Sequence, residues 1–320
     1  MAHWAKSDRV GTGIGAIVLM LTLLVTGCTR LPPERAVSLH VPASTAPVQG
    51  KMPAVSGEYT FGFDQRMDPV EDVRMYAPFL RYLEKATGLR FRLQSLTPEE
   101  NLIDALGTGQ VSLAAIGTLS YLQAHQKYGV KAIARGITEQ GKAEYQALII
   151  TAPGSPIHSL ADLKGRTFAF GADTSTQGHL IPLIMLKRAG INLTDLSGYI
   201  FTGSHFETAN AVMSGRYAAG GIQDTLGREL ANKGLVRVIA QSEEFPSSTI
   251  SVSPALPQVD VEKIQQALLE FQPLGKDKGL LYHWEQTEMP RGFVPTDDNT
   301  FAGVRVWAQK LGLLQAGGGK

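Results

Sequence analysis

Segments typical of strands and of helices alternate along this chain from residue 58 to residue 311. Short apolar runs, such as 166–172, are followed by segments in which apolar residues recur at helical spacing, such as 175–189. This alternation predicts an α/β architecture with mostly parallel sheets flanked by helices. We find no repeat of fixed period. A body of about 255 residues is large for a single core, so we expect two lobes.

Two local features refine this pattern. Pro78 interrupts the helix predicted for 70–86, so we expect a kink or a late start there. Thr97-Pro98-Glu99-Glu100 has the form of a capping box with proline at the first helical position, and it predicts a helix that ends near Gly107. The remaining strands are expected at 59–63, 91–93, 111–116, 131–135, 145–151, 199–202, 218–222, 236–241 and 250–252, and the remaining main helices at 205–214, 224–233, 259–272 and 297–311.

The first 27 residues are typical of an export signal, because Lys6 and Arg9 precede the apolar run 14–25. The run ends at Val25-Thr26-Gly27-Cys28, which resembles the lipobox of bacterial lipoproteins, and Cys28 is the only cysteine in the chain. We therefore expect lipidation at Cys28 and a folded domain outside the cytoplasm, anchored to a membrane of the cell envelope. An uncleaved membrane anchor with an incidental cysteine is the alternative to lipidation at Cys28.

Residues 28–57 are rich in proline, which predicts a tether between the anchor and the folded body. Residues 313–320 are expected to form a flexible tail.

Composition excludes several classes of protein. The chain has 30 basic and 29 acidic residues, so it lacks the basic excess of a nucleic-acid-binding protein. A single cysteine excludes an internal disulfide and a cysteine-rich metal site. We find no nucleophile elbow, no Walker A loop and no His-Glu-x-x-His motif, and the seven histidines are scattered. We therefore predict neither a catalytic residue nor a metal nor a cofactor.

Three junctions from strand to helix are candidate anion sites. They lie at 168–179, where Ser175 and Thr176 precede a helix, at 199–205, which ends in His205, and at 117–121, which includes Ser120 and Tyr121. Ligands of α/β sheets lie beyond the carboxyl ends of strands, and the first N–H groups of a helix bind anions without lysine or arginine. An ordinary serine N-cap is the alternative interpretation of the first junction, and a cap or a surface residue is the alternative for His205.

Four segments follow one another in an order typical of one family of binding proteins. They are Ser159-Leu160-Ala161-Asp162-Leu163-Lys164-Gly165-Arg166-Thr167-Phe168-Ala169-Phe170, then Ser175-Thr176 with Gly178, Leu180 and Pro182, then Phe201-Thr202-Gly203-Ser204-His205, and later Gly292-Phe293-Val294-Pro295. With these segments, the chain from about Glu58 to Leu313 resembles the phosphonate and phosphite substrate-binding proteins of ABC importers, a subgroup of the two-lobed periplasmic binding proteins. The resemblance implies one lobe from 58–146 plus 250–312, a second lobe from 147–249, and two crossings that act as a hinge.

The resemblance also implies a ligand site in the cleft between the lobes. Ser175 and Thr176 would hold the oxygens of a small oxyanion, and His205 would donate a further hydrogen bond. The full set of expected ligand-binding residues is Tyr145, Ser175, Thr176, Gln177, His205, Ser120, Tyr121, Asp224 and Ser248. The resemblance implies that relatives that take aminoalkyl phosphonates bind the amine with acidic residues. Around those places this chain has Thr225 after Asp224, and Ser247-Ser248-Thr249, and these changes argue against an aminoalkyl ligand.

These features predict a monomeric solute-binding component of an ABC importer, with a phosphonate, phosphite or phosphate as its ligand and a permease as its partner. The alternative is a sensor of the same fold that signals to a membrane histidine kinase, and a lipid-anchored hydrolase is a second rival. A site made of hydroxyls, amides and a neutral histidine, without lysine or arginine, suits a monoanion better than a dianion.

Overall fold

The computed structural model describes residues 58–65, 69–94, 96 and 100–315. The predicted export signal, Cys28, the tether, most of the capping box and most of the C-terminal tail lie outside these residues. No helix in the described part of the chain has the length and apolar character needed to cross a membrane.

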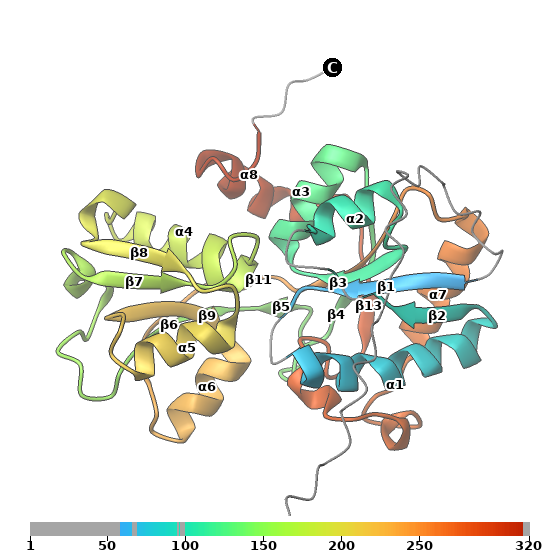
Figure 1. Ribbon diagram of the computed structural model, residues 1–320, viewed down its shortest axis with the longest axis horizontal. Helices are drawn as coiled ribbons and strands as arrows, with labels where there is room; N and C mark the ends of the chain where they lie inside the picture. The colour runs from blue at the N-terminus through green and yellow to red at the C-terminus, as the bar shows by residue number, and fades with distance from the viewer. Residues whose placement is uncertain (1–57, 66–68, 95, 97–99, 316–320) are drawn as a thin grey trace, which may run out of the picture. The chain divides into compact units, whose positions relative to one another are not determined.

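Lobe 1 contains a six-stranded mixed sheet (Figure 1). The strands β2, β1 and β3 are parallel, whereas β12 runs antiparallel between β3 and β4, and β13 is antiparallel to β4. In spatial order the strands are β13 (Phe293–Pro295), β4 (Lys131–Gly136), β12 (Thr249–Val252), β3 (Leu113–Ile116), β1 (Glu58–Phe63) and β2 (Arg90–Leu93).

Helices cover both faces of the sheet in lobe 1. An aromatic cluster packs α1 against the sheet, with the rings of Phe61 and Phe79 5.9 Å apart and those of Phe79 and Trp284 stacked at 4.8 Å. Figure 1 shows α2 and α3 on the opposite side from α1. The helices of this lobe are α1 (Pro69–Thr87), α2 (Leu102–Thr108), α3 (Thr118–Tyr128), α7 (Gln258–Glu270) and α8 (Ala302–Lys310), with short turns η4 (Lys278–Leu280), η5 (Trp284–Gln286) and η6 (Asp298–Phe301).

Lobe 2 contains a five-stranded mixed sheet. The strands β8, β7 and β9 are parallel, and β6 and β10 are antiparallel to their neighbours. In spatial order the strands are β10 (Arg237–Gln241), β6 (Ala147–Thr151), β9 (Ala219–Gln223), β7 (Thr167–Phe170) and β8 (Gly198–Phe201). The helices are α4 (Ile181–Arg188), α5 (His205–Met213) and α6 (Asp224–Asn232), with short turns η1 (Leu160–Leu163), η2 (Thr176–Leu180) and η3 (Leu193–Asp195). Figure 1 shows α4 on one face of this sheet and α5 and α6 on the other.

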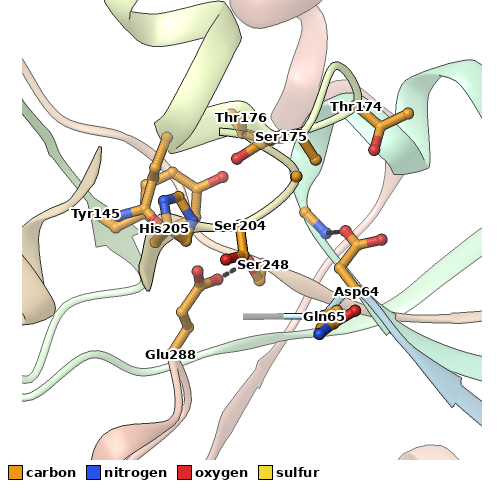
Figure 2. Close-up of a pocket in the computed structure, with 14 residues that line it drawn as sticks. Asp64, Gln65, Tyr145, Thr174, Ser175, Thr176, Ser204, His205, Ser248 and Glu288 are labelled. Atoms are coloured by element: carbon orange, nitrogen blue, oxygen red, sulfur yellow. Dashed lines mark hydrogen bonds between the residues drawn. The ribbon is translucent and has the colours of Figure 1, made fainter. Parts of the chain in front are cut away.

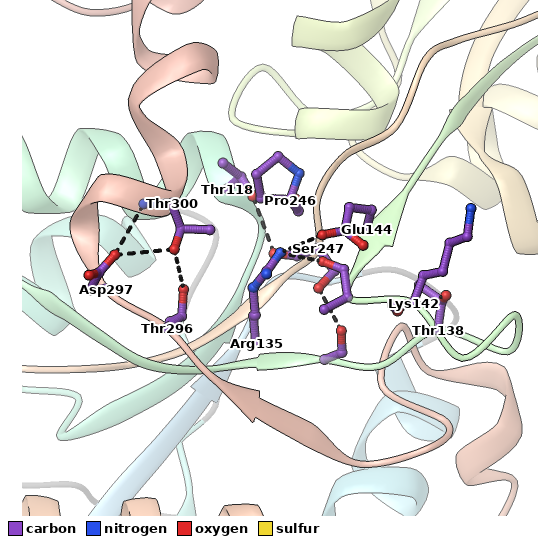
Figure 3. Close-up of polar contacts among 12 residues, drawn as sticks. Thr118, Arg135, Thr138, Lys142, Glu144, Pro246, Ser247, Thr296, Asp297 and Thr300 are labelled. Carbon is purple, nitrogen blue, oxygen red and sulfur yellow. Dashed lines mark hydrogen bonds and ion pairs between the residues drawn. The ribbon is translucent and has the colours of Figure 1, made fainter.

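Two crossings join the lobes, and both sheets belong to the same compact unit of the chain. The crossings pair with each other as β5 (Glu144–Tyr145) and β11 (Phe245–Pro246). Figure 3 shows the polar contacts that brace them: Thr118 Oγ1 donates to the carbonyl of Pro246 at 2.9 Å, and the Arg135 guanidinium donates to the carbonyl of Ala143 at 2.7 Å. The crossings are therefore anchored to lobe 1 at α3 and β4.

The two-lobed α/β architecture predicted from the sequence is confirmed, with three differences in detail. The sheets are mixed rather than mostly parallel, because strands on or beside the crossings run antiparallel to the parallel core. The helix α1 begins at Pro69 and includes Pro78, so no late start occurs. The helix α2 begins at Leu102, where the Asn101 side chain accepts from the N–H of Ile103 and Asp104. The expected start at Thr97 lies outside the described residues.

Candidate functional site

The turn that follows β7 positions the first group of polar atoms. Ser175 caps η2, and its Oγ accepts the N–H of Gly178 at 2.9 Å, so the hydroxyl proton remains to donate elsewhere. The chain folds back on itself here, because the N–H of Gly171 donates to the carbonyl of Gly178 at 2.9 Å. A Cβ on Gly178 would lie 3.0 Å from the Gly171 Cα and 3.1 Å from the His205 Cε1. This explains the glycine of the Ser-Thr-x-Gly segment.

Thr176 links the two lobes. It is 2 % exposed, and its Oγ1 accepts the N–H of Leu119, in the first turn of α3, at 2.8 Å. As with Ser175 Oγ, the Thr176 hydroxyl oxygen accepts a hydrogen bond from a protein N–H, and its own proton is left to donate. The N–H groups of Thr176 and Gln177 begin the same turn, where a helix provides no carbonyl partner.

Ser204 and His205 come from the second predicted junction, between β8 and α5. Ser204 caps α5 by accepting the N–H of Glu207 at 3.1 Å. The N–H of Gln223 donates to Nδ1 of His205 at 3.2 Å, and the ring is 5 % exposed. A ring nitrogen that accepts carries no proton, so the neutral imidazole has its proton on Nε2 and acts as a donor there.

Lobe 1 and the crossings supply the remaining walls. The Tyr145 hydroxyl donates to Thr118 Oγ1 at 3.4 Å, and Ser248 Oγ donates to the Glu288 carboxylate. Asp64 follows β1 directly, and its Oδ2 accepts the N–H of Gly117 at 2.8 Å (Figure 2). Lobe 1 therefore contributes carboxylates to the site.

These groups surround one cavity of about 190 Å³ that both lobes line. Figure 2 shows Ser175 and Thr176 at the top of the view, His205 at the left above Glu288, and Asp64 and Gln65 at the right. Among the described lining residues there is neither lysine nor arginine. The lining residues are Asp64, Gln65, Gly117, Tyr145, Ala172, Thr174, Ser175, Thr176, Gln177, Gly203, Ser204, His205, Ser248 and Glu288.

The structure brings six of the nine residues expected at the site to this cavity: Tyr145, Ser175, Thr176, Gln177, His205 and Ser248. Gln177 turns its side-chain amide away from the cavity centre, because Nε2 donates to the carbonyl of Gln146 at 2.7 Å and to Asp224 Oδ1 at 3.1 Å. Asp224 lies behind Gln177 and does not line the cavity. Burial raises the pKa of Asp224 above its ordinary value, and Arg228 partly opposes the shift.

The third predicted junction has a different role. Ser120 is 1 % exposed and lies beside the cavity wall, where its Oγ donates to Asp64 Oδ2 at 3.1 Å and to the carbonyl of Thr174 at 3.3 Å. Tyr121 points away, since its hydroxyl donates to Asp298 at 2.9 Å and its ring packs on Phe301. Burial raises the pKa of Tyr121.

Five polar side chains that line the cavity are absent from the nine expected residues: Asp64, Gln65, Thr174, Ser204 and Glu288. Asp64 stands at the carboxyl end of the first strand, so the rule used for the other junctions could have found it. Glu288 stands in a loop between η5 and β13 with no local signal, and only the tertiary structure brings it here. The expected site of hydroxyls, amides and histidine is thus corrected: it also contains two carboxylates.

Comparison with known proteins places this architecture in a family. Residues 61–301 match the family model described as the periplasmic substrate-binding protein of phosphonate ABC transporters. The chain belongs to this family. It is therefore the periplasmic substrate-binding component of an ABC importer of the phosphonate type, a solute-binding protein rather than an enzyme.

Individual relatives agree with this assignment. The phosphate-import protein PhnD of Mycolicibacterium smegmatis is 26% identical over 72% of this chain and 78% of its own length. The phosphonates-binding periplasmic protein of Escherichia coli is 28% identical over 43% of this chain and 42% of its own length. The solved structure of PhnD1 from Prochlorococcus marinus, in complex with methylphosphonate, shares the fold with a TM-score of 0.71 at 18% identity, covering 81% of this chain and 99% of that one. The sensing alternative finds no support among these matches.

Proposed function

We propose that this chain is a lipid-anchored, monomeric binding protein that holds a small phosphorus oxyanion, namely a phosphonate, phosphite or phosphate, between its lobes and delivers it to an ABC permease. The observation that carries the proposal is the cluster of directed donors in lobe 2. Ser175, Thr176 and Ser204 each accept a protein N–H, so each hydroxyl keeps its proton for a ligand. With Nε2 of His205 they form a wall of donors.

Such a wall suits an oxyanion. Preorganised O–H and N–H dipoles stabilise a buried anion without a formal counter-charge, and hydrogen bonds to an ion are stronger than those between neutral groups. The cavity of about 190 Å³ has room for a compact tetrahedral acid. Relatives named for phosphate import and phosphonate binding, and a fold neighbour that holds methylphosphonate, support phosphorus oxyanions as the ligand class.

The position of the site also supports a clamp. Donors come from lobe 2, carboxylates from lobe 1, and Tyr145 lies on a crossing, so a ligand in the cavity contacts both lobes. Contacts made only when the lobes are together bias the hinge toward its closed form. A permease would then recognise the closed, loaded protein.

Calorimetry and thermal unfolding of the purified protein test this function. Phosphite, methylphosphonate or phosphate should bind and raise the unfolding temperature. His205→Ala should lower the affinity by about tenfold or more, because a hydrogen bond to a charged group contributes about 1.5–3 kcal/mol, while the fold persists. Absence of binding by all three anions would refute the proposal.

Mass spectrometry of the N-terminal peptide tests the lipid anchor, using protein isolated from the cells that produce it. Acyl chains on Cys28 are expected, and they should be absent from Cys28→Ala.

A further inference from the structure

The helix α8 is fastened to lobe 1 on both sides of its own sequence. Before the helix, Asp298 accepts hydrogen bonds from the Tyr121 hydroxyl at 2.9 Å and from the Arg305 guanidinium. After the helix, the side-chain amide of Gln123 donates to the carbonyl of Leu313 at 3.2 Å. Tyr121 and Gln123 both lie on α3, and Figure 1 shows α8 next to that helix, on the side toward lobe 2. We therefore expect α8 to move with lobe 1.

One residue of α8 also contacts lobe 2. Trp307 is half-buried, and the Arg188 guanidinium lies over its indole ring, with the guanidinium carbon 5.0 Å from the ring centroid. Arg188 is the last residue of α4, and an ion pair of 2.9 Å with Glu243, which follows β10, holds it from the side of lobe 2. An oriented cation over an aromatic face is attractive. We call this contact between Arg188 and Trp307 the clasp.

The clasp lies at the far end of a helical segment that begins at the cavity. The turn η2 continues directly into α4, because the N–H of Ile181 donates to the carbonyl of Thr176. Residues 176–188 therefore form one helical rod about 18 Å long, at 1.5 Å per residue. Thr176 lines the cavity at the start of this rod, whereas neither Arg188 nor Trp307 lines the cavity. The clasp thus acts on the element that carries ligand donors without being part of the site.

Both ends of this rod contact lobe 1. At the cavity, the N–H of Leu119 donates to Thr176 Oγ1 at 2.8 Å, and at the other end the clasp joins α4 to α8. Both contacts connect the two lobes, so both are lost when the lobes separate and both stabilise the closed form. A contact made only in the closed form raises the affinity for a ligand that binds this form, even where it does not touch the ligand.

We propose that Arg188 and Trp307 are positioning residues for ligand binding: they hold α4 of lobe 2 against α8 of lobe 1 and raise the affinity for the ligand by stabilising the closed form. The inference rests on the proposed function for its ligand. It adds a determinant of affinity that lies outside the cavity and that acts through the position of the lobe 2 turn.

Two cations over the same ring provide a matched pair of variants. Lys310 Nζ lies 5.3 Å from the centroid of the Trp307 ring, but Lys310 belongs to α8 itself, so its contact persists whether the lobes are closed or open. In calorimetry with methylphosphonate and phosphite, Arg188→Ala should weaken binding about two- to fivefold, the range of an exposed cation–π contact. Lys310→Ala should bind as the wild type does. Thermal unfolding without ligand verifies that both variants fold.

A double-mutant cycle separates the clasp from the ion pair with Glu243, which Arg188→Ala also removes. In a Trp307→Leu background the clasp is already broken, so Arg188→Ala should cause almost no further loss of affinity. Arg188→Lys keeps a cation at this position and should bind more tightly than Arg188→Ala. Full additivity of the losses from Arg188→Ala and Trp307→Leu would show that Arg188 acts independently of the ring, and it would overturn the inference.

The remaining outcomes distinguish this inference from the proposed function. If the wild type binds methylphosphonate or phosphite and Arg188→Ala binds them equally well, the proposed function survives and the clasp does not contribute to affinity. If Lys310→Ala loses as much affinity as Arg188→Ala, the ring serves lobe 1 alone and the inference fails. If the wild type binds no phosphorus oxyanion, both fail.

Discussion

The helix starts at Ser175 and at Thr118 have the same local form and different roles. Each follows a buried strand, β7 or β3, and each begins with small residues. In lobe 2 the turn leaves hydroxyl protons directed at the cavity. In lobe 1 the N–H of Gly117 is taken by Asp64 and the N–H of Leu119 by Thr176. From this difference we expect a helix start to bind an anion only where no other part of the protein already occupies its donors.

The largest effect is expected where the lobe 2 turn approaches itself most closely. In Gly178→Ala the new methyl group would lie 2.9 Å from Ser175 Oγ and 3.0 Å from the Gly171 Cα, so the turn must shift. We expect a loss of about 1–3 kcal/mol of stability from overpacking. Calorimetry should show a loss of affinity of about a hundredfold or more, because several donors move together. Gly154→Ala, at an open position, is the control, and equal effects at both glycines would contradict this role.

A pair of serine variants then compares the two junctions directly. Ser175→Ala removes a donor that faces the ligand and should weaken binding of methylphosphonate or phosphite by at least about tenfold. Ser120→Ala removes bonds of 3.1 and 3.3 Å between protein groups and should weaken binding by no more than a few-fold. Titration calorimetry of both proteins gives the two ratios. Equal losses would show that the junction in lobe 1 also binds the ligand.

The smallest expected effect concerns stability in acid. Burial lowers the pKa of His179, which lies in the lobe 2 turn, below its ordinary value of about 6.5, although its contact with the Asp173 carbonyl opposes the shift. The folded state therefore favours the neutral ring. This stability is present above the unfolded pKa and is lost as the pH falls through the folded pKa. Denaturant titrations at several pH values should show a shallower acid loss for His179→Gln than for the wild type, and identical profiles would exclude this contribution.

Much of the fold could be predicted from the sequence, because the local sequence signals and the tertiary structure agree. The apolar periodicity of 175–189 and 205–214 and the glycines that end helices, such as Gly88 and Gly190 at positive φ, placed most elements within a few residues. The direction of the strands was harder to predict from the sequence. The antiparallel strands β6 and β12 lie on or beside the crossings, and their direction depends on how the chain passes between the lobes.

The residues of the site also fall into two groups: those that a local sequence signal indicates and those that only the tertiary structure brings to the cavity. Ser175 and His205 follow strands, so a rule about strand ends could indicate them, and the structure places both at the cavity. Tyr121 was indicated by the same rule, but the helical rotation of α3 turns its hydroxyl to Asp298. Glu288 could not be found, since its loop reaches the cavity through pairing of β13 with β4 rather than through a local pattern. These ligand assignments stay predictions until binding is measured.

The bond between Thr176 Oγ1 and the N–H of Leu119 has a consequence for ligand release. One oxygen atom both fastens the lobes together and, in the proposed complex, donates to the ligand. Pulling the lobes apart therefore frees this hydroxyl to rotate and removes the lobe 1 side of the cavity from the ligand in the same movement. Unloading then needs no separate trigger inside the binding site, because any partner that spreads the lobes also lowers the affinity.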